Sequence, residues 1–347
     1  MNTSAFSVID VDKQEFLGAI VVDEPERGAA GIWSIACNEE SVFISHSGTH
    51  EVSVIDHKAM LEKFLNYPNK AVLDYDLTFL YGLRERIPLE GNGPRNMILN
   101  GDKLIIPTYF ADVLNIMDIN TNEVTSVELN PGREETAENK GERYFNDASH
   151  CFQNWQSCNG CHPGDARTDG MNWDLMNDGV GNSKNCKSML FSHMTPPNMI
   201  SGIREHAERA VRAGFNFIQF YDVSEEDAVC VDAYMKSLRP VPSPYLVNGE
   251  LSDLAKEGQK VFEKLKCGEC HSGVYYTDMK YHRIGEDIEF EKGWDTPTLR
   301  EVWRTAPYLF DGRAATMKEV FSVHKHGIEK KVSEKDIEAL TEYVNSL

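Results

Sequence analysis

The chain has 347 residues, and 41% of them are apolar, which is enough for two or three domains that each bury a core. A formal net charge of −20 argues against nucleic acid and against an anionic membrane surface as partners, and the lack of any run of eighteen apolar residues excludes a transmembrane helix. The acidity suits a basic protein partner or simply keeps the chain dissolved, and composition alone does not choose between the two.

Residues 1–135 are predicted to form strands, because apolar and polar residues alternate between turn residues. One phrase recurs: Phe-Ser-Val-Ile-Asp at 6–10 returns as Val-Ser-Val-Ile-Asp at 52–56 and, more loosely, at 114–118. The second interval is longer than the first because of an insertion around residues 67–86. A period of about 40–50 residues with several short strands is typical of propeller blades.

This pattern resembles the YVTN-type β-propeller repeat. A propeller closes with about four blades or more, and two to three repeats are present in this sequence. We therefore expect an incomplete propeller that belongs to a longer chain, whose first blades and export signal are missing; residues 1–18 show no signal peptide. The alternative is an unusual small β-domain.

From about residue 138 the pattern changes to helices, and this region repeats itself. Four pairs of segments match at a step of 109 or 110 residues: 158–162 with 267–271, 185–189 with 295–299, 195–197 with 305–307, and 223–227 with 332–336. Several collinear matches exclude chance. We therefore expect two copies of one helical domain, at 138–240 and 248–347, linked by the proline-rich spacer 239–244.

Helices are expected at both ends of each copy. One precedes each cysteine motif, around residues 141–145 and 258–262. The other closes the copy and opens with a capping box, formed by Ser224 with Asp227 and by Ser333 with Asp336.

Each copy contains a Cys-x-x-Cys-His motif, which fits the covalent attachment of haem c. Two thiols three positions apart reach both vinyl groups of one porphyrin, and the adjacent histidine falls beneath the iron as its proximal ligand. The attaching residues are Cys158, Cys161, Cys267 and Cys270, and the proximal ligands are His162 and His271. A zinc ribbon would not separate its pairs by 109 residues, and a thioredoxin-like dithiol would need a βαβ setting.

The two copies differ where a second axial ligand is expected. His324 and His326 in the second copy correspond to Gly214 and Asn216 in the first, and neither of the latter is a good iron ligand. We expect the second haem to have a sixth protein ligand, which suits electron transfer, and the first to keep an open position, which suits small-molecule chemistry. The alternative is that both histidines are ordinary surface residues.

Two polar residues near the first motif are catalytic candidates. His193, the counterpart of Trp303, is expected either to cap the first iron or to act as an acid–base group; a core histidine with satisfied hydrogen bonds is the alternative. Glu208 is the second candidate, although a glutamate on a helix is usually a solvated residue.

Residues 141–347 resemble the di-haem cytochrome c peroxidase family, which includes the haem enzyme that matures tryptophan tryptophylquinone. The resemblance rests on both haem motifs, on Thr-Pro-Thr-Leu-Arg at 296–300, and above all on the segment 305–316. It implies that the first haem reacts with peroxide and that the second receives electrons from a small donor protein of the cytochrome or cupredoxin type. It also implies a calcium ion, with Asn185, Asp295 and the carbonyl of Pro297 as ligands.

The chain departs from the family in two places. The sixth ligand of the second haem is typically methionine, whereas His324 aligns with it here and His326 follows closely. The first copy has Ser-Gly-Ile-Arg at 201–204 in place of the usual Asp-Gly-Arg. Two histidine ligands would lower the potential of the second haem, which makes peroxidase activity less secure than haem binding.

The expected protein is multidomain, with a partial all-β propeller followed by two all-α cytochrome-c-like domains. We expect a di-haem oxidoreductase that reduces hydrogen peroxide, with electrons entering at the second haem, and a periplasmic or other extracytoplasmic location, where haem c is attached. One alternative is an electron carrier in which both haems are six-coordinate. The other is an oxidase of a protein or organic substrate that docks on the propeller.

Overall fold

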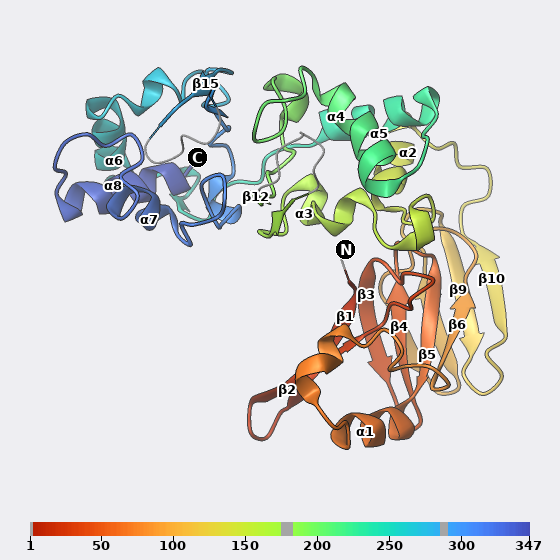
Figure 1. Ribbon diagram of the computed structural model, residues 1–347. Helices are drawn as coiled ribbons and strands as arrows, with labels where there is room; N and C mark the ends of the chain where they lie inside the picture. Colours follow the sequence, from red (N-terminus) through yellow and green to blue (C-terminus); the bar gives the residue numbers. More distant parts are fainter. Residues whose placement is uncertain (1–2, 175–182, 285–290) are drawn as a thin grey trace. The chain divides into compact units, whose positions relative to one another are not determined.

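The computed structural model describes residues 3–174, 183–284 and 291–347 (Figure 1). The chain forms two compact units. The first, which we call the sheet unit, consists of residues 1–160 and 219–223, and the second, the helical unit, of residues 161–218 and 224–347.

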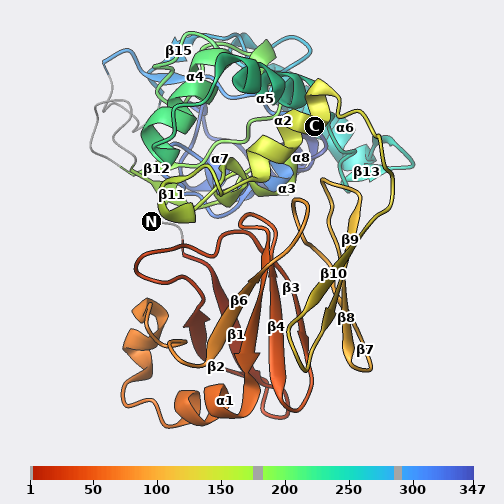
Figure 2. The ribbon, with the colours of Figure 1, turned by 90° about the vertical axis from the view of Figure 1, so that its right-hand side faces the viewer.

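The sheet unit contains two four-stranded antiparallel sheets in which strands adjacent in sequence are paired. The first has the order β3 (Ile32–Cys37), β4 (Ser41–His46), β5 (Glu51–Asp56) and β6 (Arg84–Pro88). The second has the order β7 (Ile98–Asn100), β8 (Lys103–Pro107), β9 (Val113–Asp118) and β10 (Val124–Glu128), and Figure 2 shows its strands beside one another. A separate hairpin joins β1 (Ala5–Asp10) to β2 (Glu15–Val21).

The recurring phrase occupies equivalent strands. It forms β5 and β9, the third strand of each four-stranded sheet, and also β1 of the hairpin. Two sheets of four strands agree with the predicted repeat, and the hairpin corresponds to the last two strands of a third. Within residues 3–160 the sheets do not close into a ring, so a complete propeller is absent from the described chain.

The insertion that lengthens the second repeat interval lies between β5 and β6. It forms α1 (His57–Leu65), capped by Asp56, and a 3₁₀ helix (Lys70–Tyr75). Phe64 and Leu73 of these helices are fully buried and pack with Ile20, Ile44 and Ile55 of the strands. A second core between the sheets contains Phe43, Val52, Leu104, Ile106 and Met117.

Helix α2 (Ala137–Asn146) and two short 3₁₀ helices, Phe152–Asn154 and Cys158–Gly160, complete the sheet unit. Backbone hydrogen bonds tie this segment to the strand loops: Gly28 N–H donates to Gln153 O at 2.7 Å, and Ala148 N–H donates to Gly48 O at 2.8 Å.

The helical unit contains most elements of the two predicted copies, whereas α2 and the 3₁₀ helix Cys158–Gly160 of the first copy belong to the sheet unit. The first copy contributes α3 (Pro163–Ala166), β11 (Asn172–Trp173), β12 (Lys184–Asn185), a 3₁₀ helix (Ser192–Met194), α4 (Ala207–Ala213) and α5 (Glu225–Ser237). The second has β13 (Leu246–Val247), β14 (Glu250–Leu251), α6 (Asp253–Lys264), a 3₁₀ helix (Cys267–Glu269), β15 (Tyr281–His282), β16 (Trp294–Asp295), a 3₁₀ helix (Val302–Arg304), α7 (Met317–Ser322) and α8 (Glu334–Asn345). The predicted caps are confirmed, since Ser224 accepts from Asp227 N–H and Ser333 from Asp336 N–H.

The two copies exchange equivalent backbone hydrogen bonds. Asn185 N–H donates to Phe310 O at 2.7 Å, and Asp295 N–H donates to Ile200 O at 3.3 Å. Each residue of the first bond lies 110 positions from its counterpart in the second. The copies are therefore related by a local two-fold arrangement that joins β12 and β16 to the opposite copy.

Packing in the second copy is closest where α6 meets α8. Gly258 lies at this contact, and a Cβ atom on it would be 1.8 Å from Ala339 O. Phe262, Leu340 and Tyr343 fill the surrounding core. Among the described residues, no helix is both long and apolar enough to cross a membrane.

Candidate functional site

The second cysteine motif is a short 3₁₀ turn that follows α6. Lys266 is in the left-handed region with φ 63°, and the backbone N–H of His271 donates to Cys267 O at 2.9 Å. His271 Nδ1 lies 3.1 Å from Tyr276 O. A carbonyl only accepts, so Nδ1 carries the proton and Nε2 remains free to bind a metal. Burial raises the pKa of the Cys267 thiol to about 11.

The ring of His326 lies close to that of His271. Their ring centres are 6.3 Å apart at an interplanar angle of 49°. With a metal–nitrogen bond of about 2.0 Å to each imidazole and roughly 1.2 Å from that nitrogen to the ring centre, opposed ligands of one metal would have centres about 6.4 Å apart. Burial lowers the pKa of His326 to about 4, so its imidazole is neutral at neutral pH and able to coordinate.

The other candidate, His324, lies two residues before His326, and its backbone N–H donates to Glu319 O. Of the two histidines, His326 is the one whose ring lies near that of His271. The residue that aligns with the family's methionine is thus not the one opposite the proximal histidine. The residues present fit a haem with two axial histidines.

The first motif has the same local design. His162 Nδ1 lies 3.0 Å from Arg167 O, and Arg167 is the counterpart of Tyr276. Burial lowers the pKa of His162, although hydrogen bonds from its ring to backbone carbonyls oppose this effect, so the imidazole is neutral at neutral pH. Burial also raises the pKa of the Cys158 thiol to about 12.

A histidine comparable to His326 is lacking at the matching place in the first copy. Residues 214–219 form a single turn of π-helix, and Asn216 is exposed. Gln219, at the end of this turn, is 2% exposed and donates from Nε2 to Cys158 Sγ at 3.2 Å. Its Oε1 has no hydrogen-bond partner in the part of the chain that the structure describes. Sequence reasoning missed Gln219, because a single glutamine without a motif gives no signal.

The two catalytic candidates are engaged by other side chains. His193 is buried and its Nε2 lies 3.0 Å from Asp232 Oδ1, while Arg212 holds the other oxygen of that carboxylate. His193 Nδ1 is buried and has no hydrogen-bond partner within residues 3–174, 183–284 and 291–347. Glu208 pairs with Lys236 at 3.0 Å, and both side chains are nearly half exposed.

The calcium candidates share one suggestive property. Asn185 Oδ1 and Asp295 Oδ1 are both buried and have no hydrogen-bond partner among the described residues, which is compatible with cation binding. A protein cation is already present, however, because Lys187 Nζ lies 2.5 Å from Asp295 Oδ2. The carbonyl of Pro297 acts as a hydrogen-bond acceptor for His271, which opposes the burial that lowers the pKa of that imidazole.

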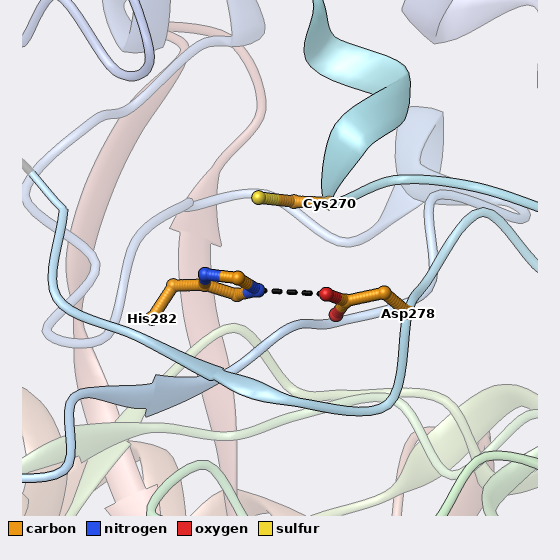
Figure 3. A group of neighbouring side chains, drawn as sticks. All are labelled: Cys270, Asp278 and His282. Carbon is orange, nitrogen blue, oxygen red and sulfur yellow. Dashed lines mark hydrogen bonds and ion pairs between the residues drawn. The ribbon is translucent and has the colours of Figure 1, made fainter.

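Three side chains gather beside the second motif (Figure 3). His282 Nε2 lies 2.8 Å from Asp278 Oδ2, and Cys270 Sγ is within 4.8 Å of both groups. The first copy has the equivalent pair of Trp173 and Asp169, joined at 3.0 Å. Because a tryptophan replaces the histidine, we interpret the pair as a brace for the loop that carries the motif.

A cavity of about 620 Å³ opens in the helical unit. The cavity is lined by residues of the loop 196–205 of the first copy and by Tyr281 and Lys292 of the second. The hydroxyl of Tyr281 donates to Gly202 O at 2.8 Å.

Comparison with known proteins finds two distant relatives. No family model matches it. It is similar to hydrazine synthase subunit gamma of Kuenenia stuttgartiensis, with 27% identity over 272 aligned residues that cover 60% of this chain and 76% of that protein. It is also similar to cytochrome c551 peroxidase of Nitrosomonas europaea, with 23% identity over 181 residues that cover 44% of this chain and 51% of the relative. The chain thus spans about half the length of that peroxidase.

One solved structure is similar to this chain in fold. A structure of Kuenenia stuttgartiensis hydrazine synthase under xenon pressure has a TM-score of 0.55 at 24% identity, over 63% of this chain and 89% of that chain. A MauG-like protein associated with microbial copper homeostasis has a TM-score of 0.48 at 17% identity, over 64% and 91%. The peroxidase relative agrees with the resemblance found in the sequence, and the synthase subunit adds a second kind of enzyme.

Proposed function

We propose that the protein is a c-type di-haem oxidoreductase, with one haem attached at residues 158–162 and the other at 267–271. The observation that supports this best is the opposed pair His271 and His326, whose spacing fits two axial ligands of one iron. When bound, each haem supplies one-electron redox chemistry. The chain supplies neutral, buried imidazoles whose Nδ1–H groups are held by backbone carbonyls.

The two copies have different roles in this proposal. His271 and His326 would both hold the second haem, which would supply electron transfer. The first copy, with Asn216 in the place of His326, leaves one side of its centre without that ligand, which suits the binding of a small molecule. Gln219 is the buried polar residue that we place beside the first haem, because it contacts Cys158.

Hydrogen peroxide is the substrate that the peroxidase resemblance implies, with a small cytochrome or cupredoxin as electron donor. A small nitrogen compound is the second candidate, since the similarity to hydrazine synthase subunit gamma covers more of the chain. The axial histidine in place of methionine favours this second candidate, because it lowers the potential of the electron-entry haem. Because haem c is attached outside the cytoplasm, we propose a periplasmic or other extracytoplasmic location.

One experiment separates these possibilities. The chain is expressed with a cytochrome c maturation system, its haems are counted, and EPR spectra are recorded oxidised and half-reduced, before and after one equivalent of hydrogen peroxide or hydroxylamine. We expect two covalent haems in the wild type and one in Cys158→Ala/Cys161→Ala. A high-spin signal consumed by peroxide supports the peroxidase, and one altered only by hydroxylamine supports the nitrogen substrate. Two low-spin haems that neither reagent changes would contradict an open first haem.

A further inference from the structure

A buried ion pair joins the two copies of the helical unit behind His162. Arg167 Nε donates to Glu301 Oε2 at 2.8 Å, and Arg167 Nη2 donates to Glu301 Oε1 at 2.9 Å. The side chains of Arg167 and Glu301 are 5% and 1% exposed, so water and salt screen the pair only weakly. A bidentate pair of this kind fixes the orientation of both partners.

Further hydrogen bonds tie the pair to its surroundings. Arg167 Nη2 also donates to Arg239 O at 2.9 Å. Glu301 accepts from Arg304 Nε at 2.8 Å and from the backbone N–H of Val241. Burial alone would raise the pKa of Glu301, but these hydrogen bonds, that of Arg167 first, lower it overall. The carboxylate is therefore charged at neutral pH and is held by the spacer and by the second copy.

The backbone of Arg167 holds the imidazole of His162. The carbonyl of Arg167 accepts from His162 Nδ1–H at 3.0 Å, which fixes both the tautomer and the direction of the ring. The position of this carbonyl depends on the side chain of the same residue, which is anchored on Glu301 in the other copy. Orientation of the His162 ring is thus linked to the second copy through one residue.

Within the described residues, no comparable ion pair supports the histidine of the second copy. His271 Nδ1 donates to the carbonyl of Tyr276, whose hydroxyl lies 3.3 Å from that of Tyr343 within the same copy. The counterpart of Glu301 in the first copy is Phe191, which carries no charge. Through this ion pair, the second copy can influence the histidine of the first. In the other direction, Phe191 of the first copy packs against Tyr275, with ring centres 5.0 Å apart, and supplies no charge.

We propose that Arg167 is a positioning residue through which Glu301 sets the orientation of His162 and, with it, the properties of the first haem. The inference rests on the proposed function, because it requires a haem on His162. It assigns the second copy a role beyond its own haem: a movement that displaces Glu301 would reach the proximal ligand of the first haem.

The test compares two variants of the full, haem-loaded chain. Arg167→Met removes the guanidinium that binds Glu301 and so holds the Arg167 carbonyl in place to accept from His162. Arg304→Met is the matched control, because it removes another partner of Glu301 that has no bond to His162. We expect Arg167→Met to shift the midpoint potential and the EPR signal of the first haem while those of the second stay unchanged. Arg304→Met should alter neither haem.

A milder variant guards against loss of folding. Glu301→Gln keeps the shape of the side chain and removes its charge, so it should shift the first haem in the same direction by a smaller amount. Unchanged signals in both Arg167→Met and Glu301→Gln, or an equal shift in Arg304→Met, would overturn the inference. Absence of haem at residues 158–162 in the wild-type chain would instead contradict the proposed function, so the two failures are distinguishable.

Discussion

The imidazole of His326 lies opposite that of His271, with ring centres 6.3 Å apart. His326 lies in the turn that follows α7, and its backbone N–H donates to Val320 O. The C-terminal end of α7 therefore sets the position of the His326 backbone. His271 is held from the other side by the carbonyl of Tyr276. The backbone of His326 and the ring of His271 are therefore both held by backbone groups, which favours a preformed pair of ligands.

Replacement of His326 should open the second haem. We expect His326→Ala to convert a low-spin signal into a high-spin one, and His326→Met to raise the midpoint potential of that haem by on the order of 100 mV. EPR and potentiometric titration measure both effects. His324→Ala is the matched control, and a loss of the low-spin signal in this variant would show that His324 is the ligand instead.

Gly258 should tolerate no side chain. Alanine usually stabilises a helix relative to glycine by roughly 0.5–1 kcal/mol, but at this position its Cβ would lie 1.8 Å from Ala339 O. The helices α6 and α8 must then separate, so we expect Gly258→Ala to lower the free energy of unfolding by about 2–3 kcal/mol in urea titration. Gly214→Ala, which meets no atom within 4 Å, is the control and should be nearly neutral.

The sheet unit should lose stability in mild acid because of His46. This residue is fully buried, and its ring forms hydrogen bonds through Nδ1 with Ala29 O and through Nε2 with Ser53 Oγ. Burial lowers the pKa of His46 from its ordinary value of 6.5 to about 4. Between these pH values the unfolded chain binds a proton that the folded chain does not, so stability falls as the pH drops below about 6.5. The loss should be about 2 kcal/mol at pH 5.

Urea unfolding at pH 7 and pH 5 measures this effect. His46→Gln should be less stable at pH 7 but should lose less on acidification than the wild type. His206→Gln, whose side chain is 58% exposed, should behave as the wild type. If the wild type and His46→Gln lost equal stability between the two pH values, the histidine would not be responsible.

Much of the fold could be predicted because it depends on local patterns. The recurring phrase lies on equivalent strands, and Ser224 and Ser333 cap the expected helices. Closure of the sheets could not be tested from three repeats, and within the described residues they form no ring. The reciprocal bonds of Asn185 and Asp295 were also beyond prediction, because they depend on how two copies meet and not on either copy alone.

The candidate site could be predicted where covalent spacing sets it, at residues 158–162 and 267–271. A choice between His324 and His326 as the ligand candidate needed the conformation of the turn after α7, which an alignment of motifs does not describe. Arg167 and Glu301 are 134 residues apart and carry no motif, so their pairing needed the structure. Single polar residues far apart in sequence give no pattern until the backbone brings them together.

Because of Lys187, the stability of the protein should not depend on calcium. Its ammonium lies 2.5 Å from Asp295, whose side chain is 2% exposed, so a protein cation already offsets the buried carboxylate. Burial raises the pKa of Asp295, and the interaction with Lys187 opposes this rise only in part.

We expect a calcium chelator to leave the urea midpoint of the wild type unchanged. Lys187→Met should lower the free energy of unfolding by about 2 kcal/mol, less than a fully buried pair because Lys187 is 28% exposed. Added calcium should restore part of this loss, and Lys260→Met, on an exposed pair, should show neither effect. A chelator that destabilises the wild type would instead show that Asn185 and Asp295 bind calcium, with Lys187 as a bystander.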